Sequence, residues 1–190
     1  MDTVIARVAA IDLGGGDEMA LIRGKARLET YDKLQGVQDI TQWIQPQNHI
    51  ALLIPTGTSF GNGHWIAVFT DPATRTLHHF DSYGLGPEGE LKYVKNPLVL
   101  QRLLGNLYMK AQQSGWNLQI NRTEFQQWGN NINTCGRHVI CRIRLSYLND
   151  EQYARLLTNQ RISPDQIVTY LTFLALNDDE KDMGQIKSVV

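Results

Sequence analysis

The run Gly63-His64-Trp65-Ile66-Ala67-Val68-Phe69 is the stretch from which the fold can be worked out. It is apolar, with β-branched and aromatic side chains, which is typical of a buried strand. The turn signal Asp71-Pro72 follows it, and residues 75–80 can form its partner strand. The pattern therefore predicts two antiparallel strands joined in a hairpin.

Further strand and helix signals lie on both sides of this hairpin. Residues 49–54 form an apolar run that ends at Pro55, and residues 116–122 alternate, with Leu118 and Ile120 predicted to point inward. The helix signals are the leucines at helical spacing in 98–111, the apolar side of 136–148, and shorter fragments around 27–34 and 39–44. Residues 84–89 are predicted to be a loop.

The run Ser163-Pro164-Asp165-Gln166 predicts where the last helix begins, and we expect it to end at about residue 176. Serine can cap it, proline suits the first position, and glutamine can close a capping box. Residues 3–11 could form another strand, followed by the flexible break Leu13-Gly14-Gly15-Gly16-Asp17. The elements together predict one α+β domain around a central antiparallel or mixed sheet.

The composition excludes several classes of protein. With 190 residues, 42% apolar and 19% charged, the chain suits a single globular domain. No apolar run reaches the ~18 residues of a membrane span, and the N-terminus lacks a signal-peptide pattern, which favours a reducing compartment. The net charge of −1 provides no footprint for nucleic acid. Arg137, Arg142 and Arg144 are interpreted as a solvated helix face.

The two cysteines have different interpretations. Cys135 and Cys141 are six residues apart on one predicted helix. That spacing is about 9 Å of rise, beyond the ~7 Å reach of a disulfide. Without a matching set of histidines they form no structural zinc site, so we expect no metal. Cys141 has apolar neighbours and is predicted to be a core residue, whereas Cys135 opens the helix and is the candidate nucleophile.

A cysteine at that position can be held as thiolate in two ways. The positive end of the helix favours an anion in its first turn, with Asn133 or Thr134 as the cap. A neighbouring imidazole can also hold the proton. His64 is the candidate base, and Asp81 could orient its ring. These two residues are 17 positions apart, so a hairpin would bring them to the same end of the sheet.

Two glutamines could complete the site. The side-chain amide of Gln126 or Gln127 could donate to a developing oxyanion, alongside the backbone N–H of Cys135. Gly136 would let substrate backbone come close to the start of the helix.

Each of these residues has a simpler structural interpretation when it is taken alone, and it is their order and spacing that favour a catalytic site. His49, His78 and His79 are interpreted as strand residues with local hydrogen bonds. His138 is the one rival base, because it follows Cys135 by three residues on the same helix. It could pair with Cys135 locally, but we expect nothing near it to orient its ring.

The motifs resemble a known superfamily of cysteine proteases. Gly63-His64-Trp65, Phe80-Asp81-Ser82-Tyr83-Gly84, Phe125-Gln126-Gln127 and Thr134-Cys135-Gly136 follow the order of the superfamily that joins the adenovirus maturation protease (adenain) to the SUMO-specific Ulp proteases. The Cys-Gly-Arg-His form and compact size look most like members encoded by large DNA viruses, virophages and related transposons. Gly36-Val37-Gln38-Asp39 resembles a short viral motif ahead of the core.

The resemblance implies a papain-like-related domain with a His64, Asp81 and Cys135 triad and an oxyanion glutamine. It also implies that Trp65 packs beside the base and, with Gly136, contacts substrate. We expect a single domain over 1–190, with an N-terminal arm (1–25), a catalytic core (30–150), C-terminal helices (151–176) and a tail (177–190). Gln126 and Gln127 lie nine and eight residues before Cys135, a longer spacing than is usual, which leaves the choice between them open.

The function that the resemblance implies is a viral cysteine endopeptidase that cleaves capsid or other virion precursors at glycine-containing sites. Such an enzyme would act in the cytoplasmic virus factory of the host cell and in the virion, as a monomer without cofactors. Residues 13–16 would then resemble a self-processing site. The alternatives are a ubiquitin or SUMO isopeptidase, an acetyltransferase with the same triad, and a non-catalytic binding module. Activation by DNA or by a disulfide-linked peptide is not supported by the charge or the cysteine count.

Overall fold

The computed structural model describes residues 19–55, 63–89, 102–129, 133–158 and 161–177. The expected strand at 3–11, the glycine run at 13–16 and the tail at 178–190 lie outside these ranges. So do the first residues of the helix expected from 98. None of the helices in the described ranges is long and apolar enough to cross a membrane.

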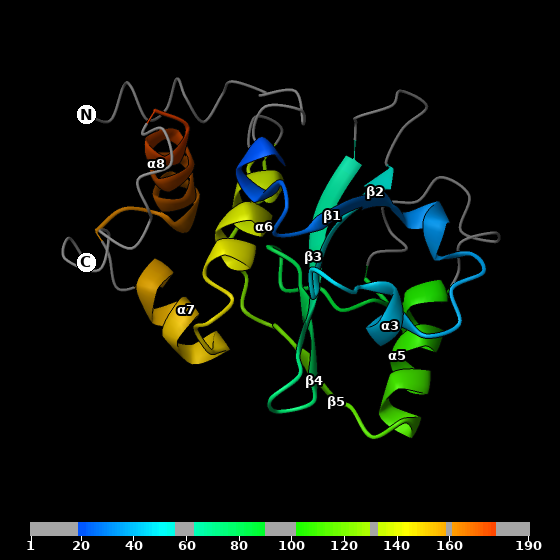
Figure 1. Cartoon of the computed structure of the whole chain (residues 1–190). Helices are drawn as coiled ribbons and strands as arrows, with labels where there is room; N and C mark the ends of the chain where they lie inside the picture. Colours follow the sequence, from blue (N-terminus) through cyan, green and yellow to red (C-terminus); the bar gives the residue numbers. More distant parts are fainter. Residues whose placement is uncertain (1–18, 56–62, 90–101, 130–132, 159–160, 178–190) are drawn as a thin grey trace.

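A five-stranded mixed sheet forms the centre of the molecule (Figure 1). Its strands lie in chain order: β1 (Arg27–Thr30), β2 (His49–Pro55), β3 (Gly63–Asp71), β4 (Thr76–Phe80) and β5 (Asn117–Ile120). The central strand β3 is antiparallel to both β2 and β4, while the edge strands β1 and β5 pair in parallel with β2 and β4. The α+β class with a mixed sheet is therefore confirmed.

The central hairpin and most of the helices agree with the sequence patterns. β3 and β4 pair with Ala67 opposite Phe80, as the hairpin prediction requires. The helical elements are η1 (Ala20–Ile22), η2 (Tyr31–Leu34), α3 (Ile40–Trp43), α5 (Leu103–Gln113), α6 (Cys135–Arg144), α7 (Asp150–Thr158) and α8 (Pro164–Asn177). The helix expected around 27–34 is wrong in its first half, because residues 27–30 pair with β2 as a strand.

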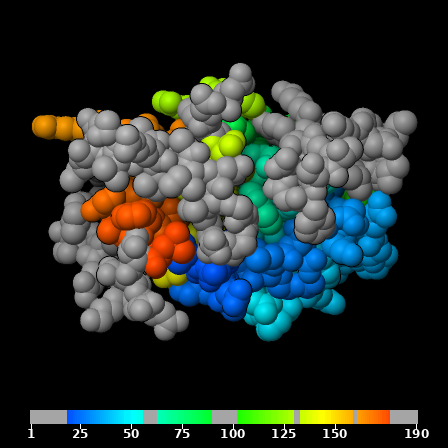
Figure 2. All heavy atoms as spheres, turned by 90° about the horizontal axis from the view of Figure 1, so that it is seen from above, coloured from blue at the N-terminus to red at the C-terminus, as the bar shows by residue number. Residues whose placement is uncertain are grey.

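Helices cover both faces of the sheet (Figure 1). α6, α7 and α8 lie on one side, and α3 and α5 on the other. Alternate residues of β3 serve the two cores: Ala67 and Phe69 pack with α6 and α8, while Ile66 and Val68 pack with α5. η1 contacts α6 and α8, and the blue N-terminal segment lies beside the orange α8 in Figure 2.

The arginines of α6 do not form a solvated face, so that interpretation was wrong. Arg137 and Arg142 are each 1% exposed. Arg142 donates to the Asp150 carboxylate at 2.8 Å and lies 4.7 Å from the centre of the Phe69 ring. Aromatic faces and one carboxylate thus compensate the buried guanidinium. The helical periodicity could not show this, because the compensating groups come from β3 and α7.

The predicted capping box at the start of α8 is confirmed. The Gln166 backbone N–H donates to the Ser163 hydroxyl at 3.3 Å, and the Ser163 N–H donates to the Gln166 side-chain oxygen at 2.9 Å. These reciprocal bonds hold the first turn of the helix in place. They also fix the position of Asp165, which lies inside that turn.

Candidate active site

The hairpin brings His64 and Asp81 into direct contact. His64 is the second residue of β3, and Asp81 follows the last residue of β4, so both lie at the same end of the antiparallel pair. The His64 Nε2 and Asp81 Oδ1 atoms are 2.9 Å apart, and the side chains are 4% and 0% exposed. A Cβ at the preceding Gly63 would lie 2.4 Å from the Ile54 carbonyl oxygen, so only glycine fits there.

Asn121, which the sequence did not single out, clamps the backbone of Asp81. Its side-chain oxygen accepts from the Asp81 N–H at 2.7 Å, and its amide nitrogen donates to the Asp81 carbonyl at 2.9 Å. The Tyr83 N–H also donates to Asp81 Oδ1, at 2.8 Å. The carboxylate therefore has a fixed orientation toward His64. A polar residue directly after a strand was the signal that could have identified Asn121.

Cys135 is the first residue of α6 and is half-buried. Its side chain hydrogen-bonds to His64. Because Nε2 of the ring faces Asp81, Nδ1 is the nitrogen left for the sulfur. Burial alone would lower the pKa of His64, but the hydrogen bonds and charges of Asp81 and Cys135 raise it to about 10. An imidazolium between two anions is the state that a thiolate–imidazolium pair requires.

Two aromatic rings form a stack that leads from the buried His64 ring to the surface. Tyr83 stacks on His64 with 5.2 Å between ring centres, and Trp128 stacks on Tyr83 at 3.9 Å. Burial, followed by the charge of Cys135, raises the pKa of Tyr83 to about 12, so the phenol stays neutral. Trp128 is 57% exposed. The rings shield one face of the imidazole, and the sequence did not point to Trp128.

The two candidate glutamines have different environments. Gln126 is 1% exposed. The Ser82 hydroxyl donates to its side-chain oxygen at 2.7 Å, and its backbone N–H donates to the Ser82 carbonyl at 2.9 Å. Because Ser82 engages the oxygen, the amide nitrogen points away from Ser82. The side chain of Gln127 is exposed, and its backbone N–H donates to Asp165. This placement favours Gln126 as the oxyanion donor.

Trp65 and Gly136 lie on the α6 side of the site. Trp65 is half-buried against the core that includes Val139 and Ile140 of α6. Gly136 is buried in the first turn of α6, next to Cys135. Their contact with substrate stays a prediction.

The structure corrects the prediction that nothing would orient His138. Its Nε2 lies 3.1 Å from Asp165 Oδ1, and its side chain is completely buried. Burial lowers the pKa of His138, although the Asp165 hydrogen bond opposes that effect. The ring is therefore neutral and donates its Nε2 proton to the carboxylate. Thr134 precedes α6 at the cap position, but its hydroxyl donates to Asp165 instead of capping the helix.

Of the remaining histidines, His49 has the local hydrogen bond expected of it. His79 instead bonds to a residue 29 positions away, and His78 stacks on Phe69 with 4.5 Å between ring centres. His49 Nδ1 lies 2.8 Å from the Gln47 carbonyl oxygen. His79 is bonded to the Tyr108 hydroxyl at 2.9 Å and to the Leu85 carbonyl at 3.2 Å, and burial lowers its pKa to about 4. Among the described residues no group of three or more histidine, cysteine or acidic side chains could hold a metal ion.

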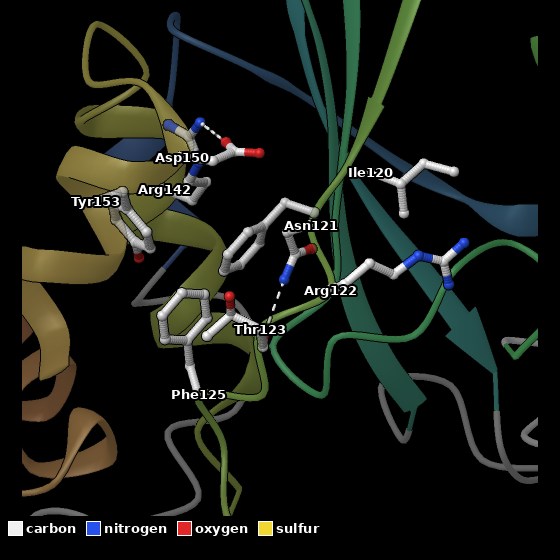
Figure 3. A pocket seen from close by; sticks show the side chains of 9 residues that line it. Ile120, Asn121, Arg122, Thr123, Phe125, Arg142, Asp150 and Tyr153 are labelled. Atoms are coloured by element: carbon white, nitrogen blue, oxygen red, sulfur yellow. Dashed lines mark hydrogen bonds and ion pairs between the residues drawn. The ribbon is translucent and has the colours of Figure 1, made fainter.

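A small, partly open pocket of about 90 Å³ lies between the end of β5 and helices α6 and α7 (Figure 3). Arg142 and Asp150, joined by an ion pair, lie on one wall, and Ile120 and Asn121 on the other. Asn121 thus lines the pocket and also clamps Asp81.

Sequence and structure comparisons give distant similarities. No family model matches the chain. An uncharacterized protein, V9, of Sputnik virophage is 25% identical over 170 residues, which cover 85% of this chain and 94% of V9.

Three solved structures resemble this chain at TM-scores below 0.5. A crystal structure of an ASFV protease is 17% identical, with a TM-score of 0.45; the match covers 76% of this chain but only 57% of that protease. The Chlamydia trachomatis effector Cdu1 bound to ubiquitin is 15% identical, with a TM-score of 0.42 over 93% and 79% of the two chains. The Ulp1 protease domain in complex with Smt3, the yeast ortholog of SUMO, is 16% identical, with a TM-score of 0.39 over 94% and 76%.

Proposed function

We propose that this chain is a cysteine endopeptidase with Cys135 as nucleophile, His64 as general base and acid, and Asp81 as the residue that orients His64. The observation that supports it most is the buried line of Asp81, His64 and Cys135, with the cysteine at the first position of α6. The line brings together residues from one strand, the end of another and the start of a helix, and an imidazolium between two acidic groups is the arrangement that activates a catalytic thiol.

The chemistry follows from these positions. The Cys135 thiolate attacks the carbonyl carbon of the scissile peptide, forming a C–S bond while the C=O electron pair moves to the oxygen. The Cys135 N–H at the start of α6 and the Gln126 amide donate to that oxygen. The C–N bond then breaks as the His64 imidazolium gives its proton to the leaving amine. Water, deprotonated by the neutral His64, hydrolyses the thioester and restores the ion pair.

For the substrate, we propose capsid or other virion precursor proteins, cleaved near glycine. The motif resemblance to maturation proteases of DNA viruses and virophages supports this choice, together with the virophage relative that spans most of the chain. The proposed place of action is the host cytoplasm and the virion, with the enzyme as a monomer.

The test compares Cys135→Ala with Cys141→Ala on a co-expressed major capsid protein. Cys135→Ala should abolish cleavage, because the nucleophile is gone, whereas Cys141→Ala removes a buried sulfur on the same helix and should only lower stability by about 1–2 kcal/mol. Mass spectrometry of the products gives the cleavage sites. Unchanged cleavage by Cys135→Ala would refute the assigned nucleophile.

A parallel arm of this experiment separates the substrates. Ubiquitin and SUMO probes that carry a C-terminal vinyl ester react only with an enzyme that binds those modifiers. Labelling of Cys135 by a probe, without cleavage of capsid protein, would replace the endopeptidase with an isopeptidase that uses the same triad.

A further inference from the structure

Asp165 is a buried acid in the first turn of α8 that the catalytic chemistry above does not use. It is 5% exposed, and three hydrogen-bond donors from two other segments converge on it. Oδ1 accepts from the Thr134 hydroxyl and from His138 Nε2, and Oδ2 accepts from the Gln127 N–H at 2.9 Å. Each donor adjoins a part of the proposed site.

Those donors define what Asp165 holds together. Thr134 directly precedes Cys135, and His138 lies one turn further along α6. Gln127 directly follows Gln126, the proposed oxyanion donor. A single carboxylate therefore links the start of α6, the nucleophile helix that carries Cys135, to the loop that carries Gln126 and Gln127. We call this second segment the oxyanion loop. Both segments are in turn fixed to α8, whose first turn the Ser163–Gln166 capping box stabilises.

The chemistry of the three contacts requires a carboxylate. A hydroxyl, an imidazole N–H and a peptide N–H all donate, so every partner needs an acceptor, and a carboxylate has two acceptor oxygens. These hydrogen bonds outweigh burial, which acts in the opposite direction, and lower the pKa of Asp165. The group is thus ionised when it holds the two segments.

We propose that Asp165 is a positioning residue of this active site, setting the distance between the Cys135 sulfur and the Gln126 amide. The inference rests on the function proposed above. A displacement of about 1 Å of an oxyanion donor can cost ~10²-fold in rate, so a fixed link between the two segments has a direct kinetic value. Asp165 does not touch the substrate in this role.

Asp165→Asn tests the proposal because it breaks one contact selectively. The asparagine oxygen can still accept from Thr134 and His138, but its NH₂ then faces the Gln127 N–H, donor against donor. The oxyanion loop should shift while the start of α6 stays in place. We expect kcat for a peptide amide ending in Gly-Gly-aminomethylcoumarin to fall about 10- to 100-fold, with KM changed less than about threefold.

The second readout distinguishes positioning from loss of structure. Iodoacetamide reacts with the Cys135 thiolate without using an oxyanion donor, so its rate at pH 6 should stay within about threefold of wild type. A purely structural role would lower both rates together, in proportion to the folded fraction. Ser163→Ala is the matched control, because it weakens the start of the same helix by about 1 kcal/mol but retains the Asp165 carboxylate and its three donors.

If Asp165→Asn does not fold, Thr134→Val and Thr134→Ser provide the same test from the other partner. Serine keeps the hydroxyl and should restore kcat, whereas valine removes the donor and should lower it. A kcat within twofold of wild type for folded Asp165→Asn, or equal kcat for both Thr134 variants, would overturn the proposal. Cleavage by wild type that Cys135→Ala abolishes would still uphold the proposed function in that case.

Discussion

Two buried pairs of histidine and aspartate lie within the described residues, and they behave differently. In the first pair His64 Nε2 lies 2.9 Å from Asp81, and in the second His138 Nε2 lies 3.1 Å from Asp165. The pKa of His64 is raised to about 10, whereas burial lowers that of His138. Nearly equal hydrogen bonds therefore leave one ring charged and the other neutral.

The difference lies in what else surrounds each pair. His64 has a second acidic partner, Cys135, and both partners favour its charged form. The His138 ring has one hydrogen-bonding partner within the described ranges, Asp165, and the nearby charge of His64 also lowers its pKa. The Asp165 carboxylate in turn accepts from Thr134 and Gln127, so its charge is shared among three donors. A histidine beside an aspartate is thus not enough to identify a catalytic base. The second partner on the other side of the ring is what keeps His64 charged.

The largest effect that would sharpen this comparison is expected for His64→Ala. It removes the base and acid, so kcat/KM should fall by about 10⁴-fold or more. It should also shift the pH dependence of Cys135 alkylation by iodoacetamide, so that the reaction requires the pH at which a free thiol ionises, near 8.5. His138→Ala leaves the ion pair in place, so alkylation at pH 6 should persist despite lower stability. Equal loss of low-pH alkylation in both variants would remove the distinction between the pairs.

A smaller effect is expected for Asp81→Asn. The asparagine keeps the size of the side chain, but its NH₂ can face His64 Nε2 and favour the wrong tautomer of the ring. We expect kcat to fall about 10²- to 10⁴-fold with little change in KM. Steady-state kinetics on the Gly-Gly amide checks this, with circular dichroism to show a native fold. A decrease below about threefold would mean that Cys135 alone keeps His64 charged.

The smallest expected effect is on how the free energy of unfolding changes with pH, as measured by urea unfolding. The pKa of His64 is raised from 6.5 to about 10, so the stabilisation by its charge is complete below pH 6.5 and lost as the pH rises through about 10. The pKa of Asp165 is lowered from 3.8, so its contribution exists above that pH and disappears in more acidic solution.

His64→Gln should therefore approach the stability of wild type as the pH rises toward about 10, where His64 loses its charge. Asp165→Asn should approach it below pH 3.8, where Asp165 becomes protonated. A stability difference between wild type and His64→Gln that stays constant from pH 6.5 to 10 would contradict the charged state of His64.

Local features of the fold were predictable from the sequence. The hairpin at 63–80 and the capping box at Ser163 depend on periodicity and on residues three positions apart, and both are confirmed. The strand at 49–54 and the helices after 103 and 135 follow from apolar patterns in the same way. The segment 27–34 was mispredicted, because its pairing with β2 is a contact with a distant part of the chain.

The candidate site was predictable in the part that one hairpin and one helix start define. The His64–Asp81 contact depends only on the antiparallel pairing of adjacent strands, so a spacing of 17 residues was informative. The sequence did not identify three residues around the site: Asn121, Trp128 and Asp165. Asn121 reaches Asp81 from 40 positions away, and Asp165 reaches Thr134 from 31.

By itself the sequence determined the α+β class, the central hairpin, the helix behind Cys135 and the order of the catalytic candidates, since each arises from interactions between near neighbours. Only the tertiary structure decided which glutamine is buried, which histidine is charged and which acid joins α8 to the nucleophile helix. Those outcomes depend on burial and on donors from segments far apart in the chain. Such contacts exist only after the helices have packed on the sheet.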